Sequence, residues 1–244
     1  MSAKLVAVVT GATGGIGAAI AEALQPEFEV IGLDLRADAG SVPVIQADVT
    51  DRRSIEAAAA AVARDHGEVR LVVNAAGSLT MNRFLDLPDD EWRRVLDINA
   101  YGTFLVGQVF AREMSQRAAG RIVNVASIAA KTPLANQAHY CAAKAAVMML
   151  GRVMALELAE HGIRVFTICP GAVDTELFRQ CLNWTAERDG RDPDALLAEW
   201  LAPSRLGRFV QAAEIADLVR FLALGPTDAM TGHALSIDGG IAPF

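Results

Sequence analysis

A tyrosine and a lysine four residues apart are the side chains best suited to proton transfer in this sequence. Tyr140 and Lys144 would project from the same face of a helix. A phenol with a reference pKa of about 10 is a poor base at neutral pH, but a nearby ammonium group lowers that pKa. Ser127 precedes the tyrosine by thirteen residues and could orient a carbonyl or alcohol oxygen. Together they predict acid–base chemistry, although the Tyr–Lys spacing alone also fits a chance surface pair.

A cluster of glycines indicates a second site, for a phosphate group. Gly11, Gly15 and Gly17 lie within the stretch TGATGGIG. Glycines allow a sharp turn whose N–H groups approach a diphosphate at the positive end of a helix, although a tight turn without a ligand is the alternative. Asp34 follows Gly17 by seventeen residues. A carboxylate there can accept hydrogen bonds from ribose hydroxyls and repel a 2′-phosphate, which predicts NAD as the cofactor, with Arg36 as the basic residue close by.

The elements that must position these residues alternate between strands and helices. Short apolar runs predict strands at 5–9, 29–33, 44–47, 69–73, 121–126, 164–169 and 234–237. Apolar residues at helical spacing predict helices at 16–24, 51–66, 89–114, 138–161 and 211–224, the third with a bend at Gly102. This alternation is typical of a single Rossmann-type α/β domain, 1–244, with a doubly wound parallel sheet and helices on both faces.

Polar or glycine residues follow several of the predicted strands. They are Gly11, Asp34, Asp48, Asn74, Ser127 and Gly171. Ligands of such sheets bind beyond the carboxyl ends of the strands, so one site could contain all of these residues.

Composition excludes several other classes of protein. The 244 residues are 52% hydrophobic and 21% charged, which excludes intrinsic disorder. A net charge of −7 argues against nucleic acid or an anionic membrane as a partner. No apolar run approaches the ~18 residues of a spanning helix. The three cysteines lack metal-ligand spacing, so we expect no metal site, reduced thiols and a cytoplasmic location.

Taken in order, the motifs resemble those of the short-chain dehydrogenase/reductase family over essentially the whole chain. The matching segments are TGATGGIG, Asp48-Val49, Asn74-Ala75-Ala76-Gly77, Asn99, Ser127, Tyr140 with Lys144, Pro170-Gly171 with Thr175, and Asp238-Gly239-Gly240. No single segment is decisive, but their combined order and spacing are specific. The resemblance implies an NAD-dependent oxidoreductase that interconverts a secondary alcohol and its ketone.

The resemblance also implies roles for individual residues. Tyr140 would be the general acid/base, Ser127 would hydrogen-bond the substrate oxygen, and Lys144 would hold the nicotinamide ribose and lower the tyrosine pKa. Asn99 would support a water-linked proton relay to that lysine. The implied cofactor contacts are Gly11, Gly15, Ile16 and Gly17 at the diphosphate, Asp34, Asp48 and Val49 at the adenosine, Asn74, Ala75 and Gly77 along the ribose–nicotinamide path, and Tyr140, Lys144, Pro170, Gly171, Val173 and Thr175 at the nicotinamide end.

The segment 174–203 is expected to be irregular, helical in parts, and mobile. A charged stretch with Gly190 and Pro193 separates two apolar patches that contain Trp184 and Trp200. The resemblance implies that this segment is a substrate lid, suited to a compact or cyclic hydrophobic substrate. A cyclic diol such as a 2,3-dihydro-2,3-dihydroxybenzoate-like compound and a polyol are the leading classes. A 3-oxoacyl-thioester reductase is the alternative, and a non-catalytic nucleotide-binding regulator is a more distant one.

A stripe of apolar residues on the helix predicted at 138–161 bears on assembly. Val147, Leu150, Met154 and Leu158 repeat at helical spacing. The stripe fits a core-facing helix equally well, but in the resembled family such a stripe often meets a second subunit. We therefore expect a homotetramer.

Overall fold

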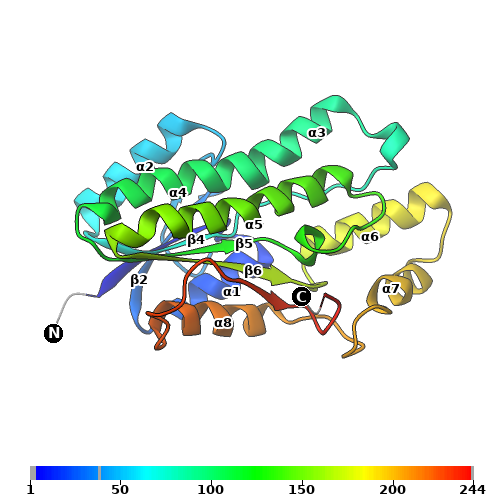
Figure 1. Ribbon diagram of the computed structural model, residues 1–244. Coiled ribbons are helices and arrows are strands. Elements are labelled where there is room, and N and C mark those ends of the chain that lie inside the picture. Colours follow the sequence, from blue (N-terminus) through cyan, green and yellow to red (C-terminus); the bar gives the residue numbers. More distant parts are fainter. Residues whose placement is uncertain (1–3, 38–39, 243–244) are drawn as a thin grey trace.

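One parallel sheet of seven strands forms the centre of the computed structural model, which describes residues 4–37 and 40–242 (Figure 1). The strands in the described part are β1 (Leu5–Thr10), β2 (Phe28–Asp34), β3 (Val44–Gln46), β4 (Val69–Asn74), β5 (Gly120–Val125), β6 (Ile163–Pro170) and β7 (Ala234–Ile237). Their spatial order is β3-β2-β1-β4-β5-β6-β7. The predicted doubly wound α/β fold is confirmed; residues 1–3, 38–39 and 243–244 of the expected domain lie outside the described residues.

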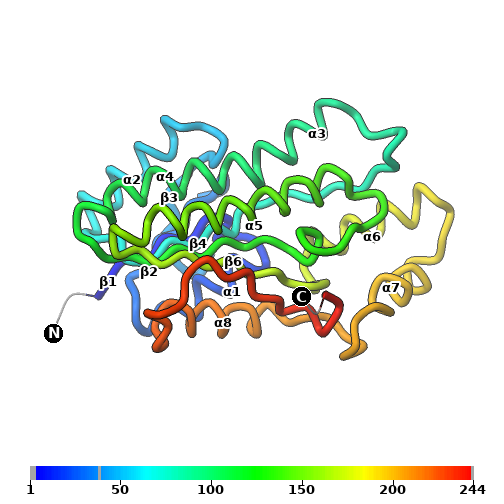
Figure 2. The backbone as a smooth tube through the Cα atoms, in the orientation of Figure 1, coloured from blue at the N-terminus to red at the C-terminus, as the bar shows by residue number. Residues whose placement is uncertain are grey.

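Helices cover both faces of the sheet. They are α1 (Gly15–Leu24), α2 (Arg52–Asp65), α3 (Asp89–Leu96), α4 (Gly102–Ser115), α5 (Ala138–Leu158), α6 (Glu176–Asp189), α7 (Pro193–Leu201) and α8 (Ala212–Leu224). The core has α1 and α8 on one face and α2, α4 and α5 on the other. In Figure 2, α6 and α7 lie at one end of the molecule, beyond the sheet. Within the described ranges, no helix has both the length and the apolarity to cross a bilayer.

The central strand β1 shows why continuous apolar runs form these strands. Ala7 and Val9 are buried in the core on the side of α1 and α8, whereas Val6 and Val8 are buried on the other side. Because helices cover both faces of this parallel sheet, the residues that point to either face must be apolar. Strand β1 is therefore apolar on both faces, and polar residues such as Thr10, Asp34 and Asn74 stand at the ends of β1, β2 and β4.

The long helix predicted before the fifth strand is interrupted before Gly102. A π-helical turn, Asp97–Tyr101, separates α3 from α4. Such turns leave the regular helical hydrogen-bond pattern, and here Asn99 Nδ2 donates to Val95 O at 2.8 Å. The interruption lies directly before Gly102, where the bend was expected, and the glycine itself has a packing role. A Cβ atom at Gly102 would lie 2.9 Å from Val49 Cγ2, so the glycine permits close packing.

The segment 174–203 is more regular than expected. It consists mostly of α6 and α7, which are joined by a short connection. Gly190 ends α6 with a φ of +62°, a conformation that suits glycine. Asp192 caps α7 by accepting a hydrogen bond from Ala195 N at 2.9 Å, and Pro193 takes the first helical turn. The charged Gly/Pro stretch therefore encodes a defined helix–helix turn.

Candidate active site

Two cavities open beyond the carboxyl ends of the strands and meet at Tyr140. The larger, here termed the long groove, has a volume of about 910 Å³ and extends from the glycine turn past Asp34 to Lys144. The smaller, here termed the apolar pocket, has a volume of about 390 Å³ and lies between Ser127 and the helices α6 and α7. Tyr140 lines both cavities. Ligands in the two cavities would therefore meet at the predicted proton donor.

The glycine turn forms one end of the long groove. Gly11 has a φ of +66°, and a Cβ atom there would lie 2.8 Å from the Cα atom of Ala76. Gly14 is the N-cap of α1 and provides no side-chain cap, so the first N–H groups of the helix stay available. The groove is also lined here by Gly15, Ile16 and Gly17. Available N–H groups at a helix start bind anions, so this end fits the diphosphate of a dinucleotide.

Asp34 faces the same groove from the end of β2. Its Oδ2 atom accepts hydrogen bonds from Thr13 N at 3.1 Å and from Thr13 Oγ1 at 2.8 Å. Arg36 Nη2 donates to the same Thr13 hydroxyl at 3.0 Å. Asp48, Val49, Ala75 and Gly77 line the groove as well. The carboxylate thus lies in the predicted cavity, but a guanidinium group lies next to it.

Asn74 does not line either cavity, although the sequence analysis assigned it to the cofactor. It is buried, and its Nδ2 atom donates to Asn124 Oδ1 at 2.8 Å. Thr10, its register partner on β1, accepts hydrogen bonds from Ala75 N and Ala76 N, both at 3.0 Å. These buried polar groups fix the loop that follows β4. Asn74 therefore supports the groove from behind.

Ser127, Tyr140 and Lys144 converge where the two cavities meet. Lys144 Nζ donates to Val125 O at 3.0 Å and lies 5.5 Å from the centroid of the tyrosine ring. Burial raises the pKa of Tyr140 to about 12, an effect that its hydrogen bond with Ser127 opposes. Burial also lowers the pKa of Lys144 to about 8. The expected lowering of the tyrosine pKa is not what the structure gives, because burial of the phenol raises the pKa more than the Ser127 hydrogen bond lowers it.

Asn99 reaches this site from the π-helical turn. Its Nδ2 atom donates to Ser78 O as well as to Val95 O, each at 2.8 Å. Its Oδ1 atom is buried and has no partner within the described residues. A Cβ atom at Gly77 would lie 2.8 Å from that oxygen and 3.6 Å from Lys144 Nζ. An unpaired buried acceptor next to an amine is a place for a water or a ligand hydroxyl.

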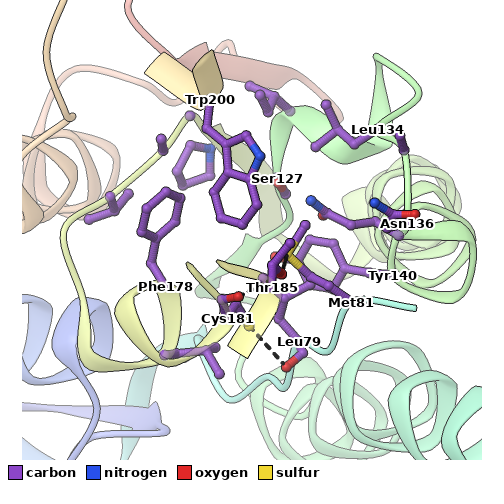
Figure 3. A pocket seen from close by; sticks show the side chains of 18 of the residues that line it. Leu79, Met81, Ser127, Leu134, Asn136, Tyr140, Phe178, Cys181, Thr185 and Trp200 are labelled. Atoms are coloured by element: carbon purple, nitrogen blue, oxygen red, sulfur yellow. Dashed lines mark hydrogen bonds between the residues drawn. The ribbon is translucent and has the colours of Figure 1, made fainter. Parts of the chain in front are cut away.

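Side chains from distant segments form the walls of the apolar pocket (Figure 3). Phe178 of α6 and Trp200 of α7 stand on one side, with ring centroids 5.6 Å apart in an edge-on arrangement. Leu79 and Met81, from the loop after β4, lie near the opposite wall with Leu134. The pocket is therefore suited to a compact apolar ring or chain.

Comparison with known proteins assigns the family. A family model described as enoyl-(acyl carrier protein) reductase matches residues 11–242. The chain is 34% identical over 245 residues to an NAD-dependent glycerol dehydrogenase of Listeria innocua, covering 96% of this chain and 92% of the relative. It is 38% identical over 248 residues to a D-threitol dehydrogenase of Mycolicibacterium smegmatis, with coverage of 96% and 92%. The chain belongs to the short-chain dehydrogenase/reductase family.

A solved structure agrees with this assignment. An actinorhodin polyketide ketoreductase with NADPH superposes with a TM-score of 0.93 at 30% identity, covering 99% of this chain and 98% of that one. This short-chain dehydrogenase/reductase is accordingly an oxidoreductase that acts on CH–OH groups with a nicotinamide dinucleotide.

The predicted nicotinamide-end residues of this short-chain dehydrogenase/reductase divide between the cavities. Pro170, Gly171 and Val173 line the apolar pocket, whereas Thr175 lines both cavities. A Cβ atom at Gly15 would lie 2.7 Å from Thr175 Cγ2, so the segment after β6 packs directly on the glycine turn. This contact therefore lies where the long groove adjoins the apolar pocket.

Two residues near the apolar pocket, Asn136 and His139, have structural roles that the sequence pattern does not predict. Asn136 lines the pocket with a φ of +64°, and its carbonyl accepts a hydrogen bond from Asn82 N at 2.9 Å. His139, next to Tyr140 in the chain, is fully buried, with Nε2 2.7 Å from Thr80 Oγ1. Both contacts tie α5 to the loop after β4. The residue type at position 136 could have indicated the left-handed backbone, because asparagine tolerates that conformation better than most residues.

A second correction concerns the two tryptophans of the lid segment. Trp200 lines the apolar pocket. Trp184 does not: it is 43% exposed, and the guanidinium carbon of Arg188 lies 4.8 Å from its ring centroid. Because α6 is amphipathic, one face carries Phe178 toward the pocket while another carries Trp184 toward solvent.

Proposed function

We propose that this protein is an NAD-dependent dehydrogenase that interconverts a secondary alcohol, either a cyclic diol or a polyol, and its ketone. The observation that carries the proposal is the arrangement around Tyr140, which joins a groove containing the Asp34 carboxylate to a compact apolar pocket. A carboxylate at this strand end favours ribose hydroxyls over a 2′-phosphate. The likeness to an NAD-dependent glycerol dehydrogenase and to a D-threitol dehydrogenase supports the substrate class.

The proposed chemistry divides between the cofactor and the side chains. Bound NAD would take the hydride from the carbinol carbon. Tyr140, whose pKa near 12 keeps the phenol neutral, donates its proton to the ketone oxygen in the reductive direction. In the oxidative direction the phenol first releases its proton toward solvent, and the resulting phenolate accepts the proton of the alcohol. Ser127 orients the same substrate oxygen from the end of β5. Lys144 and the free Oδ1 atom of Asn99 offer the next groups for that proton on its way to solvent.

We extend the proposal to the segment 174–203 as a substrate lid. Four of its large apolar residues line the pocket, Leu177, Phe178, Leu196 and Trp200. Closure of the segment over substrate would exclude water from hydride transfer. Hydrogen exchange of α6 and α7 should slow when NAD and substrate are both bound. Equal exchange rates with and without both ligands would show that these helices are a fixed wall.

A thioester reductase is the second candidate. Arg36 donates to Thr13 beside the Asp34 carboxylate, which places a cation within reach of a 2′-phosphate. The likeness to a polyketide ketoreductase with NADPH favours the same alternative. A wild-type preference for NADPH with a 3-oxoacyl thioester would select it.

We also propose a homotetramer, but on other residues than the stripe that the sequence suggested. Val147 is fully buried, and Met154 and Leu158 pack against the core on the α2–α4 side of the sheet. The large apolar residues that α5 exposes are Met149, Val153 and Leu156. Contiguous exposed apolar residues mark contact surfaces. Light scattering at micromolar concentration would contradict the proposal if it gave a monomer.

The unpaired thiols are in keeping with a cytoplasmic location, which remains part of the proposal.

A panel of neutral cyclic diols and polyols with NAD or NADP, and of 3-oxoacyl thioesters with NADH or NADPH, tests the function. Reduction of NAD by a diol or polyol is expected, followed by its change in ultraviolet absorbance. Tyr140→Phe removes the proton donor and keeps the ring, so turnover should fall at least ~100-fold while NADH affinity changes little. Retained turnover in that variant would refute the assigned mechanism.

A further inference from the structure

Charged side chains in the apolar pocket are confined to its outer rim, where α6 passes into α7. Among the described residues that line the pocket, Asp189, Arg191 and Glu199 are the ones that carry a full charge at neutral pH. The remaining lining is apolar or carries neutral groups, such as those of Ser127 and Asn136. The charge balance of this rim therefore decides which ionic substrates the pocket accepts.

Asp189 is already paired with two guanidinium groups, and neither of these arginines lines the pocket. Arg188 donates to its two carboxylate oxygens at 2.9 Å and 2.8 Å, and Arg83 donates to Oδ1 at 3.1 Å. The hydrogen bond from Arg188 holds the pKa of this carboxyl below its usual value. Arg188 also donates to Met81 O at 2.8 Å, which anchors the cluster to the pocket wall. Asp189 therefore offers no free charge to a ligand.

Arg191 is the basic residue among those that line the rim, and its guanidinium group forms an ion pair with the carboxylate of Glu199. Arg191 Nη2 and Glu199 Oε2 are 2.6 Å apart, and the two side chains are 40% and 60% exposed. The backbone fixes Arg191 in place, because its N–H donates to Ala186 O at 2.9 Å just after the left-handed Gly190. Glu199 immediately precedes Trp200 on α7. The ion pair thus spans the rim beside the aromatic wall.

We propose that the pocket selects uncharged alcohols and ketones, and that Glu199 enforces this selection by keeping Arg191 from anionic substrates. A carboxylate that enters the pocket loses water without gaining a free cation, which is costly in apolar surroundings. To be bound it must displace Glu199 from Arg191. Because exposed ion pairs are weak, the discrimination is moderate. This inference rests on the proposed function, since it takes the apolar pocket as the substrate site.

The inference narrows the proposed substrate class. Neutral polyols and neutral cyclic diols satisfy the charge balance of the rim. A carboxylated cyclic diol of the 2,3-dihydro-2,3-dihydroxybenzoate kind does not, because its carboxylate would compete with Glu199 for the same guanidinium group.

A matched pair of probes tests the role of Glu199. The ketones 4-oxocyclohexanecarboxamide and 4-oxocyclohexanecarboxylate have nearly the same size and differ by one charge. With NADH as reductant, the wild-type kcat/KM should favour the amide by about tenfold, which corresponds to about 1.4 kcal/mol. Glu199→Gln frees Arg191, so the ratio should narrow to about twofold or reverse. The double variant Glu199→Gln with Arg191→Gln should restore the preference for the amide.

Glu27→Gln serves as the matched control. Glu27 pairs with Arg220 on the surface and lines neither cavity, so its loss should leave the amide-to-carboxylate ratio unchanged. Equal wild-type kcat/KM values for the two probes, or an unchanged ratio in Glu199→Gln, would overturn the inference.

Binding separates this inference from the proposed function. If no alcohol or ketone is turned over, the proposed function fails, but calorimetry of both probes with the NADH-loaded wild type and Glu199→Gln still measures the charge preference. The same ratios are expected for the dissociation constants. Binding of the carboxylate that equals or exceeds that of the amide in the wild type, or failure of the amide to bind, would overturn the inference.

Discussion

The long groove and the apolar pocket share Tyr140 but are built in different ways. The groove is formed by turns at the strand ends, where glycines and backbone N–H groups approach the ligand and the residues of each single turn are close neighbours in the sequence. The pocket is formed by side chains from the loop after β4, the start of α5 and the helices α6 and α7. The groove depends on backbone geometry that few residues permit, and the pocket on side-chain shape that many combinations provide.

Because the two cavities are built differently, they should tolerate different amino-acid substitutions. A substitution in the groove meets backbone atoms that have no space to move, whereas a substitution in the pocket changes shape and charge while the walls stay in place. The groove should therefore fail abruptly, and the pocket should change its preference gradually.

The largest expected effect on cofactor binding tests the rigidity of the groove. A Cβ atom at Gly17 would overlap the carbonyl oxygen of Gly11, whereas a Cβ atom at Gly14 would lie 3.5 Å from the same oxygen. Gly17→Ala should weaken NADH binding by about 10- to 100-fold, since overpacking costs about 1–3 kcal/mol. Gly14→Ala should lose much less. Fluorescence titration of NADH compares the variants, and similar losses in both would break the comparison.

Burial of Lys144, at the junction of the two cavities, should make the free energy of unfolding depend on pH. The pKa of Lys144 is lowered from 10.5 to about 8 by burial. Between these values the unfolded chain holds a proton that the native protein has lost, so stability rises with pH. The free energy of unfolding should gain roughly 2 kcal/mol from this group between pH 7.5 and 9.5.

Lys144→Met provides the control for that rise, because methionine has no proton to lose. Urea unfolding of the wild type and the variant at both pH values gives the difference. Parallel pH dependences in the two proteins would show that the ammonium group is better solvated than the structure indicates.

A moderate effect is expected at the far end of the groove. Asp34→Ser removes the charge that repels a 2′-phosphate and leaves Arg36 in place, so the preference for NAD over NADP should fall about tenfold. Asp48→Asn removes a neighbouring groove carboxylate and should weaken both cofactors without altering their ratio. Dissociation constants for both cofactors decide the matter, and an unaltered ratio in Asp34→Ser would assign the choice of cofactor elsewhere.

The smallest effect should separate the two tryptophans of the lid. Trp200→Ala removes the aromatic wall of the pocket and should raise KM by up to about tenfold, in line with the ~1 kcal/mol of an aromatic contact. Trp184→Ala should leave KM within about twofold, because this ring stacks on Arg188 outside the pocket. If Trp184→Ala raised KM more, the side of α6 that faces substrate would be misassigned.

Local sequence patterns are enough to predict the sheet, the glycine turn of the groove and the shared helix face of Tyr140 and Lys144. Apolar runs fix buried parallel strands, and the turn from Gly11 to Gly17 has few conformations that avoid clashes. The spacing of Tyr140 and Lys144 places them on one face of any helix. These features depend on residues near one another in the chain, so a linear pattern is enough to specify them.

Burial, exposure and charge pairing at the site could be read only from the folded chain. The burial that raises the pKa of Tyr140, the retreat of Asn74 behind the groove and the exposure of Trp184 depend on which elements cover each residue. The pairing of Arg191 with Glu199 depends on how α7 turns back after Gly190. Burial and charge pairing are properties of the whole packed chain, because solvent is excluded by segments that are distant in sequence.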